Sequence, residues 1–86
     1  MPYVFSAHVL QEMARRNISR ESVEAVLDNP EQVVSGKNDH TIYQSRLDFG
    51  GGKIYLVRVI VDPTVEPLLV ITVYRTSKIK KYWRTS

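Results

Sequence analysis

Two arginines stand inside predicted strands. Arg58 interrupts an aliphatic run over residues 56–60, and Arg46 lies in the preceding strand. A charge in so apolar a strand must reach a partner, an edge or a polar cleft. Thr72 and Tyr74 project to one face of the last strand. Because guanidinium groups pair with phosphate oxygens, these residues favour a phosphate site. The alternative interpretations are that Arg58 is an edge charge against aggregation and that Thr72 and Tyr74 are ordinary strand formers. The hairpin registers that would bring these residues together stay open.

His8 is the second candidate for chemistry, because it lies at the start of a predicted helix. Glu12 and Arg15 share its stripe of that helix. A histidine can take and give a proton near neutral pH, as general acid–base catalysis requires. The alternative interpretation is a surface histidine on an amphipathic helix.

Positive charge is concentrated at the C-terminal end of a chain whose net charge is +3. Residues 67–86 contain no acid and five cations, which are Arg75, Lys78, Lys80, Lys81 and Arg84. Tyr82 and Trp83 are interleaved with them. This pattern favours a polyanionic partner, nucleic acid first and an anionic membrane second, and the alternative is a solvated charged tail.

Composition limits the classes of protein that fit. A chain of 86 residues with 43% apolar content predicts a single domain, residues 1–86. The absence of cysteine and the 32-residue separation of His8 and His40 argue against a closed zinc site, so we predict no metal and no cofactor. No apolar run reaches the length of about 20 residues that spans a bilayer. We therefore predict a cytoplasmic protein without a membrane partner.

The helices that must position these residues have clear sequence signals. Ser6 is expected to cap the first helix, with a staple between Phe5 and Leu10 and an inner face of Leu10, Met13 and Ala14. The second helix is expected to follow a left-handed Asn17, with Ser19 as its cap and the pair Asn29-Pro30 as its end. Its predicted inner face consists of Val23, Val26 and Leu27.

Strand patterns dominate from residue 31 onward. The expected strands are residues 32–34, 41–48, 53–62 and 68–75, with a glycine turn at 49–52 and a short basic helix or tail at 76–83. The predicted fold is α+β, with two N-terminal helices packed on a three- to four-stranded antiparallel sheet and a short basic C-terminal helix or tail.

Four short motifs carry a resemblance to a known family. They are Ser6-Ala7-His8, Arg16-Asn17-Ile18-Ser19, Asn29-Pro30 and Val70-Ile71-Thr72-Val73-Tyr74. Together they resemble the domain of unknown function 4258 (DUF4258), which is grouped with RelE/ParE-like and BrnT-like toxins in the barnase, EndoU, colicin and RelE set of ribonuclease folds. The basic segment 76–82 is similar to the tail of BrnT-like toxins. The resemblance implies a RelE-like fold, RNA cleavage without a metal, and a cognate antitoxin.

The residues and the resemblance meet in one expected mechanism, a metal-independent endoribonuclease toxin that cleaves RNA by attack of a 2′-hydroxyl on the adjacent phosphate. Its expected catalytic residues are His8 as acid or base, Arg46 and Arg58 as phosphate clamps, Thr72 to orient the phosphate, and Tyr74 to stack or to act as a second acid. The expected RNA-binding residues are Arg16, Arg75, Lys78, Lys80, Lys81, Trp83 and Arg84. The alternative is a non-catalytic RNA-binding, DNA-binding or protein-interaction module, and a homodimer is left open.

Overall fold

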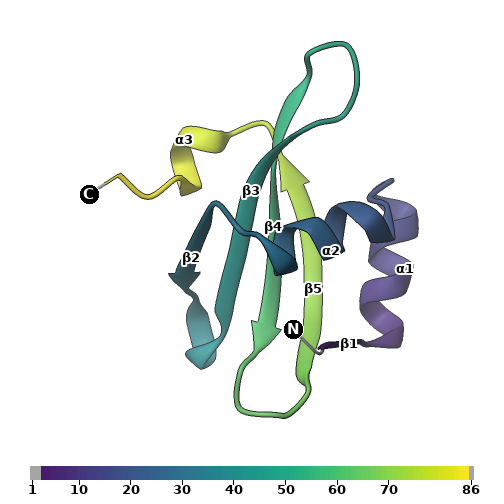
Figure 1. The fold of residues 1–86 in the computed structure, drawn as a ribbon, viewed down its shortest axis with the longest axis vertical. Helices are drawn as coiled ribbons and strands as arrows, with labels where there is room; N and C mark the ends of the chain where they lie inside the picture. The colour runs from purple at the N-terminus through teal and green to yellow at the C-terminus, as the bar shows by residue number, and fades with distance from the viewer. Residues whose placement is uncertain (1–2, 86) are drawn as a thin grey trace.

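A computed structural model describes residues 3–85 (Figure 1). The elements follow in the order β1 (Tyr3–Phe5), α1 (Ala7–Arg15), α2 (Arg20–Asp28), β2 (Gln32–Ser35), the 3-10 turn η1 (Lys37–Asp39), β3 (Thr41–Asp48), β4 (Ile54–Asp62), β5 (Leu68–Thr76) and α3 (Ile79–Tyr82). Within these residues the strands form one five-stranded sheet in the order β1-β5-β4-β3-β2. β1 runs parallel to β5, and the other neighbours are antiparallel.

The sheet overturns the predicted fold. A three- to four-stranded antiparallel, RelE-like sheet is wrong, since the described chain forms a mixed sheet of five strands. The additional strand is β1, whose Phe5 pairs with Val70 of β5. A strand of three residues is too short to show the alternation that identifies strands in sequence, so Phe5 was assigned to a helix staple instead.

The helix ends follow their local signals. The Ser6 hydroxyl accepts a hydrogen bond from the Val9 backbone N–H at 3.1 Å, and the Ser19 hydroxyl accepts one from Ser22 at 3.1 Å. Asn17 has a φ of 56°, which allows the tight turn between α1 and α2. Both predicted caps and the left-handed Asn17 are therefore confirmed.

One face of the sheet carries the core. The core cluster joins β4 and β5 to the two helices. Its buried residues include Val57, Val59, Val61, Val73, Val9, Met13, Val23, Val26 and Leu27. Figure 1 shows α2 crossing in front of the central strands and α1 beside β5. Since side chains alternate along a strand, Arg58 projects from the opposite face, which we call the α3 face. No helix of the described residues is long and apolar enough to cross a membrane.

The phase of α1 differs from the prediction. Val9 and Met13 are buried, whereas Leu10 is 46% exposed and Ala14 is also exposed. Both stripes satisfy helical spacing, and docking of α1 on β5 selects the one that contains Val9. The predicted inner face of α2, Val23, Val26 and Leu27, is confirmed.

This difference in burial gives a stability test. Leu27→Ala should lower the free energy of unfolding by about 2–5 kcal/mol, because a fully buried leucine is replaced by a cavity. Leu10→Ala is the matched control, and its effect should stay within about 0.5 kcal/mol. Urea unfolding midpoints measure both. Equal losses at the two positions would contradict the assigned face of α1.

Candidate functional site

A row of four polar side chains crosses the α3 face. Gln32, Gln44, Arg58 and Tyr74 lie directly opposite one another on β2, β3, β4 and β5. We call these four residues the polar rung. Gln44 is fully buried and Arg58 is 9% exposed. The strand registers, which the sequence left open, thus bring Arg58 and Tyr74 together.

Arg58 sets the direction of the hydrogen bonds along the polar rung. A guanidinium can only donate, so the Gln44 amide must present its oxygen to Arg58 Nε, at 2.8 Å. The Gln44 amide nitrogen then donates to Gln32 Oε1 at 2.8 Å. The Gln32 nitrogen in turn donates to the Arg84 carbonyl at 2.7 Å. Each buried amide of the rung is therefore paired and held in one orientation.

Tyr74 completes the polar rung on the other side of Arg58. Its hydroxyl oxygen accepts a hydrogen bond from Arg58 Nη1 at 2.7 Å. Among residues 3–85 the Tyr74 hydroxyl donates to no protein group. Its proton is therefore available to a bound ligand.

The C-terminal segment 77–85, which we call the strap, lies over the polar rung. The Tyr82 ring centroid is 4.4 Å from the Arg58 guanidinium carbon, and the Tyr82 carbonyl accepts from Gln44 at 3.2 Å. The Arg84 backbone N–H donates to Gln32 Oε1 at 3.0 Å, next to the bond from Gln32 to the Arg84 carbonyl. Two side-chain amides of the sheet thus dock the strap by its backbone.

A groove of about 410 Å³ opens between the strap and the sheet. We call it the Arg58 groove, and its lining consists of Val34, Ser35, Arg58, Lys81, Tyr82, Trp83, Arg84 and Thr85. Within the described residues no carboxylate forms an ion pair with Arg58. Nη2 of Arg58 also has no hydrogen-bond partner there, although no buried side-chain polar atom of the described part is unsatisfied. A nearly buried cation therefore keeps donors for an anion that enters the groove.

Arg46 lies on the same face but is already paired. Its Nε and Nη2 donate to the two carboxylate oxygens of Glu31 at 3.1 and 3.0 Å. The side chain and the backbone N–H of Arg46 hold the pKa of Glu31 below its usual value of 4.5. Because this charge is compensated, Arg46 is a weaker candidate for a phosphate clamp than Arg58.

The Glu31–Arg46 pair predicts acid sensitivity. Because the folded pKa of Glu31 is depressed, its contribution is present above pH 4.5 and is lost as the pH falls through the lower folded value. Between about pH 5 and pH 3, thermal stability should fall more steeply in the parent than in Glu31→Gln. The control Glu66→Gln alters a glutamate with no ion pair in the described structure and should keep the parental slope. Identical slopes for the parent and Glu31→Gln would contradict the role assigned to the pair.

His8 and Arg16 lie away from this site. Both belong to the helical layer, with His8 in α1 and Arg16 as its C-cap, whereas Arg58 faces the other side of the sheet. His8 Nε2 is 3.6 Å from Glu12, and Arg16 Nε donates to Glu12 at 2.9 Å. Arg16, and next Arg15, keep the pKa of Glu12 below its usual range. The structure therefore does not bring His8 to Arg58.

The other predicted site residues divide between the two faces. Thr72 lies on the α3 face, two residues before Tyr74, opposite Ile60. Arg75 projects from the helical face. Its guanidinium carbon lies 4.2 Å from the ring centroid of Phe49 and 4.8 Å from that of Tyr55. The remaining basic and aromatic residues, Lys78, Lys80, Lys81, Trp83 and Arg84, belong to the strap.

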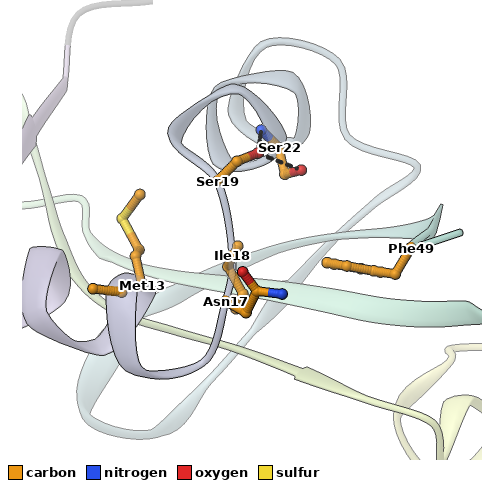
Figure 2. A pocket seen from close by; sticks show the side chains of 7 residues that line it. Met13, Asn17, Ile18, Ser19, Ser22 and Phe49 are labelled. Carbon is orange, nitrogen blue, oxygen red and sulfur yellow. Dashed lines mark hydrogen bonds between the residues drawn. The ribbon is translucent and has the colours of Figure 1, made fainter.

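A separate cavity of about 280 Å³ lies on the helical side of the molecule. Figure 2 shows Phe49 of the β3–β4 hairpin beside it, with Asn17, Ile18 and the hydrogen-bonded pair Ser19 and Ser22 at the α1–α2 turn. Its lining has no charged side chain and none of the predicted site residues. Residues 3–85 also contain no group of three or more His, Cys, Asp or Glu side chains that could hold a metal ion. The Arg58 groove is thus the better candidate for a functional site.

Comparison with protein families identifies the chain. The family model described as domain of unknown function (DUF4258) matches residues 5–75. The protein is a DUF4258 domain. No curated protein and no solved structure matches it. The match includes the whole polar rung of this DUF4258 domain and ends before the strap.

Sequence reasoning about the DUF4258 domain missed Gln32 and Gln44. Gln44 lies on the same face of β3 as the buried Ile42 and the exposed Arg46, so the alternation of the strand did not reveal its burial. Gln32 gave no signal either, because its partners are Gln44, 12 residues away, and the backbone of Arg84, 52 residues away. Only the folded chain brings it to the site.

Proposed function

We propose that this DUF4258 domain binds RNA in the Arg58 groove and cleaves it there as a metal-independent endoribonuclease. The observation that carries the proposal is a nearly buried Arg58 without a carboxylate partner among the described residues. A phosphate group is the natural counterion for such an arginine, and the cations of the strap extend the positive field along a polyanion. Tyr82 and Trp83 offer stacking surfaces for exposed bases.

The proposed cleavage needs only Arg58, which lines the groove, Tyr74, which is hydrogen-bonded to Arg58, and solvent. The 2′-hydroxyl oxygen attacks the adjacent phosphorus, its proton passes to solvent, and a 2′,3′-cyclic phosphate forms. Arg58 holds the negative charge that grows on the phosphate oxygens. Tyr74 gives its unshared hydroxyl proton to the departing 5′-oxygen as the P–O bond breaks. His8 has no part in this version of the mechanism, because it lies on the other side of the sheet.

A toxin role is part of the proposal. The support for it is the expected grouping of DUF4258 with RelE/ParE-like and BrnT-like toxins, and the activity would arrest growth from the cytoplasm. We propose a cognate antitoxin with an acidic segment that covers the Arg58 groove, since this complements the positive charge of the strap. Growth arrest on expression, relieved by a small neighbouring gene, is the expected result.

The biochemical test is incubation of the purified protein with total RNA in EDTA. We expect fragments that end in 2′,3′-cyclic phosphate, and binding that weakens steeply with salt. Intact RNA with a folded, antitoxin-free protein would refute the nuclease.

The second candidate is an RNA-binding module without catalysis. It is favoured by one observation, that no histidine or carboxylate forms a hydrogen bond or ion pair with Arg58 among the described residues.

His8→Ala separates the mechanism in which Tyr74 is the acid from one in which His8 carries the proton. We expect normal cleavage, and loss of cleavage with normal folding would restore His8 as the proton carrier.

A further inference from the structure

Trp83 is held at the edge of the α3 face by a paired arginine. The Arg46 guanidinium carbon lies 4.1 Å from the Trp83 ring centroid. Glu31 fixes this guanidinium through its two carboxylate oxygens and also accepts the Arg46 backbone N–H at 2.7 Å. Since the charge of Arg46 is compensated and its plane is fixed, Arg46 orients the indole.

The backbone on either side of Trp83 is also anchored. The preceding residue, Tyr82, accepts a hydrogen bond from Gln44, and the following residue, Arg84, exchanges two bonds with Gln32. The indole is therefore pre-organised, and a ligand that stacks on it loses little additional freedom on binding.

A cavity of about 640 Å³ lies against the indole. We call it the Trp83 cavity, and its lining consists of Arg46, Ile79, Lys80, Trp83 and Thr85. An aromatic plane and an aliphatic side chain with an ammonium and a hydroxyl group nearby suit a flat heteroaromatic ring with polar edges. Such a ring is a nucleobase.

The Trp83 cavity adjoins the Arg58 groove. Trp83 and Thr85 line both the Trp83 cavity and the Arg58 groove. A strand whose phosphate contacts Arg58 can therefore place a neighbouring base on Trp83. The cations Lys78, Lys80, Lys81 and Arg84 beside this path complement a polyanion.

We infer that the Trp83 cavity is a nucleobase subsite, in which a base next to the phosphate bound by Arg58 stacks on Trp83. The inference rests on the proposed RNA binding and adds the part of the substrate that the strap recognises. Trp83, Ile79 and Lys80 lie beyond the DUF4258 match, whereas Arg46 lies within it. The strap thus supplies the stacking surface for the base, and Arg58 of the matched region holds the phosphate.

The test uses the only tryptophan of the chain, whose fluorescence reports directly on the subsite. Two probes with 2′-O-methyl groups, which the proposed 2′-hydroxyl attack cannot cleave, are titrated at constant salt: a four-nucleotide oligoadenylate and an abasic ribose-phosphate strand of the same length. The oligoadenylate should change the Trp83 emission and bind about 5- to 150-fold tighter than the abasic strand. The abasic strand should leave the emission nearly unchanged.

Substitutions test whether the difference in affinity between the two probes comes from Trp83. Measured by anisotropy of labelled probes, Trp83→Ala should remove the preference for the oligoadenylate, and Trp83→Phe should keep most of it. Tyr55→Ala is the control, because Tyr55 faces the helical side near Phe49. Equal affinity of both strands for the parent overturns the subsite and leaves phosphate binding intact, whereas failure of both strands to bind overturns the proposed function and the subsite with it.

Discussion

Replacing Arg58 with lysine is expected to lower the rate of RNA cleavage about 10²- to 10³-fold and RNA affinity about 10- to 100-fold. The substitution keeps the positive charge, so the loss of rate and affinity measures the contribution of the guanidinium geometry alone. Arg58 contacts Gln44 and Tyr74 at once while it keeps Nη2 for an anion. The compact ammonium group of lysine cannot donate to Gln44, Tyr74 and an anion at the same time with the geometry of the planar guanidinium.

The matched control for this prediction is Arg75→Lys. Arg75 lies opposite Val57, on the helical face, one residue after Tyr74. Both variants retain the net charge of +3, and both remove one arginine from the centre of the sheet. Cleavage by Arg75→Lys should match the parent after correction for folded fraction. A loss of similar size in both variants would show that general charge or stability, and not the Arg58 groove, limits activity.

Tyr74→Phe is expected to lower the cleavage rate about 10²- to 10⁴-fold with little change in RNA affinity. The variant removes only the hydroxyl. It keeps the ring, whose centroid lies 6.2 Å from that of Tyr82. Arg58 loses one acceptor, but its bond to Gln44 remains. The leaving 5′-oxygen loses its proposed proton donor. Single-turnover cleavage and equilibrium binding separate the two effects.

Tyr55→Phe is the control for the hydroxyl substitution, because Tyr55 lies on the helical face of β4. Its cleavage rate should equal that of the parent. If Tyr74→Phe loses binding and cleavage in equal proportion, Tyr74 positions Arg58 and is not the acid. If the parent binds RNA without cutting it, both tyrosine variants should bind alike, as expected of a non-catalytic module.

Local order was readable from the sequence because its signals are local. A serine cap, a left-handed asparagine and a proline act within a few residues, so α1 and α2 were expected close to their observed positions. The glycine turn acts in the same way, since Gly50, Gly51 and Gly52 all have positive φ. The strand β3 was expected at its observed bounds, because its polar and apolar residues alternate.

Arrangement across the chain was decided only by tertiary structure. The sequence could mark Arg58 and Tyr74 as unusual, but the register of β4 against β5 made them partners, and the side of the sheet separated them from His8. β1 escaped notice because pairing with β5, and not its own three residues, makes it a strand. Gln32 joined the site through contacts with residue 84. The sequence thus marked candidate site residues and the local elements that hold them, because those signals are short-range. Long-range packing, which no short window records, sets which of these residues meet.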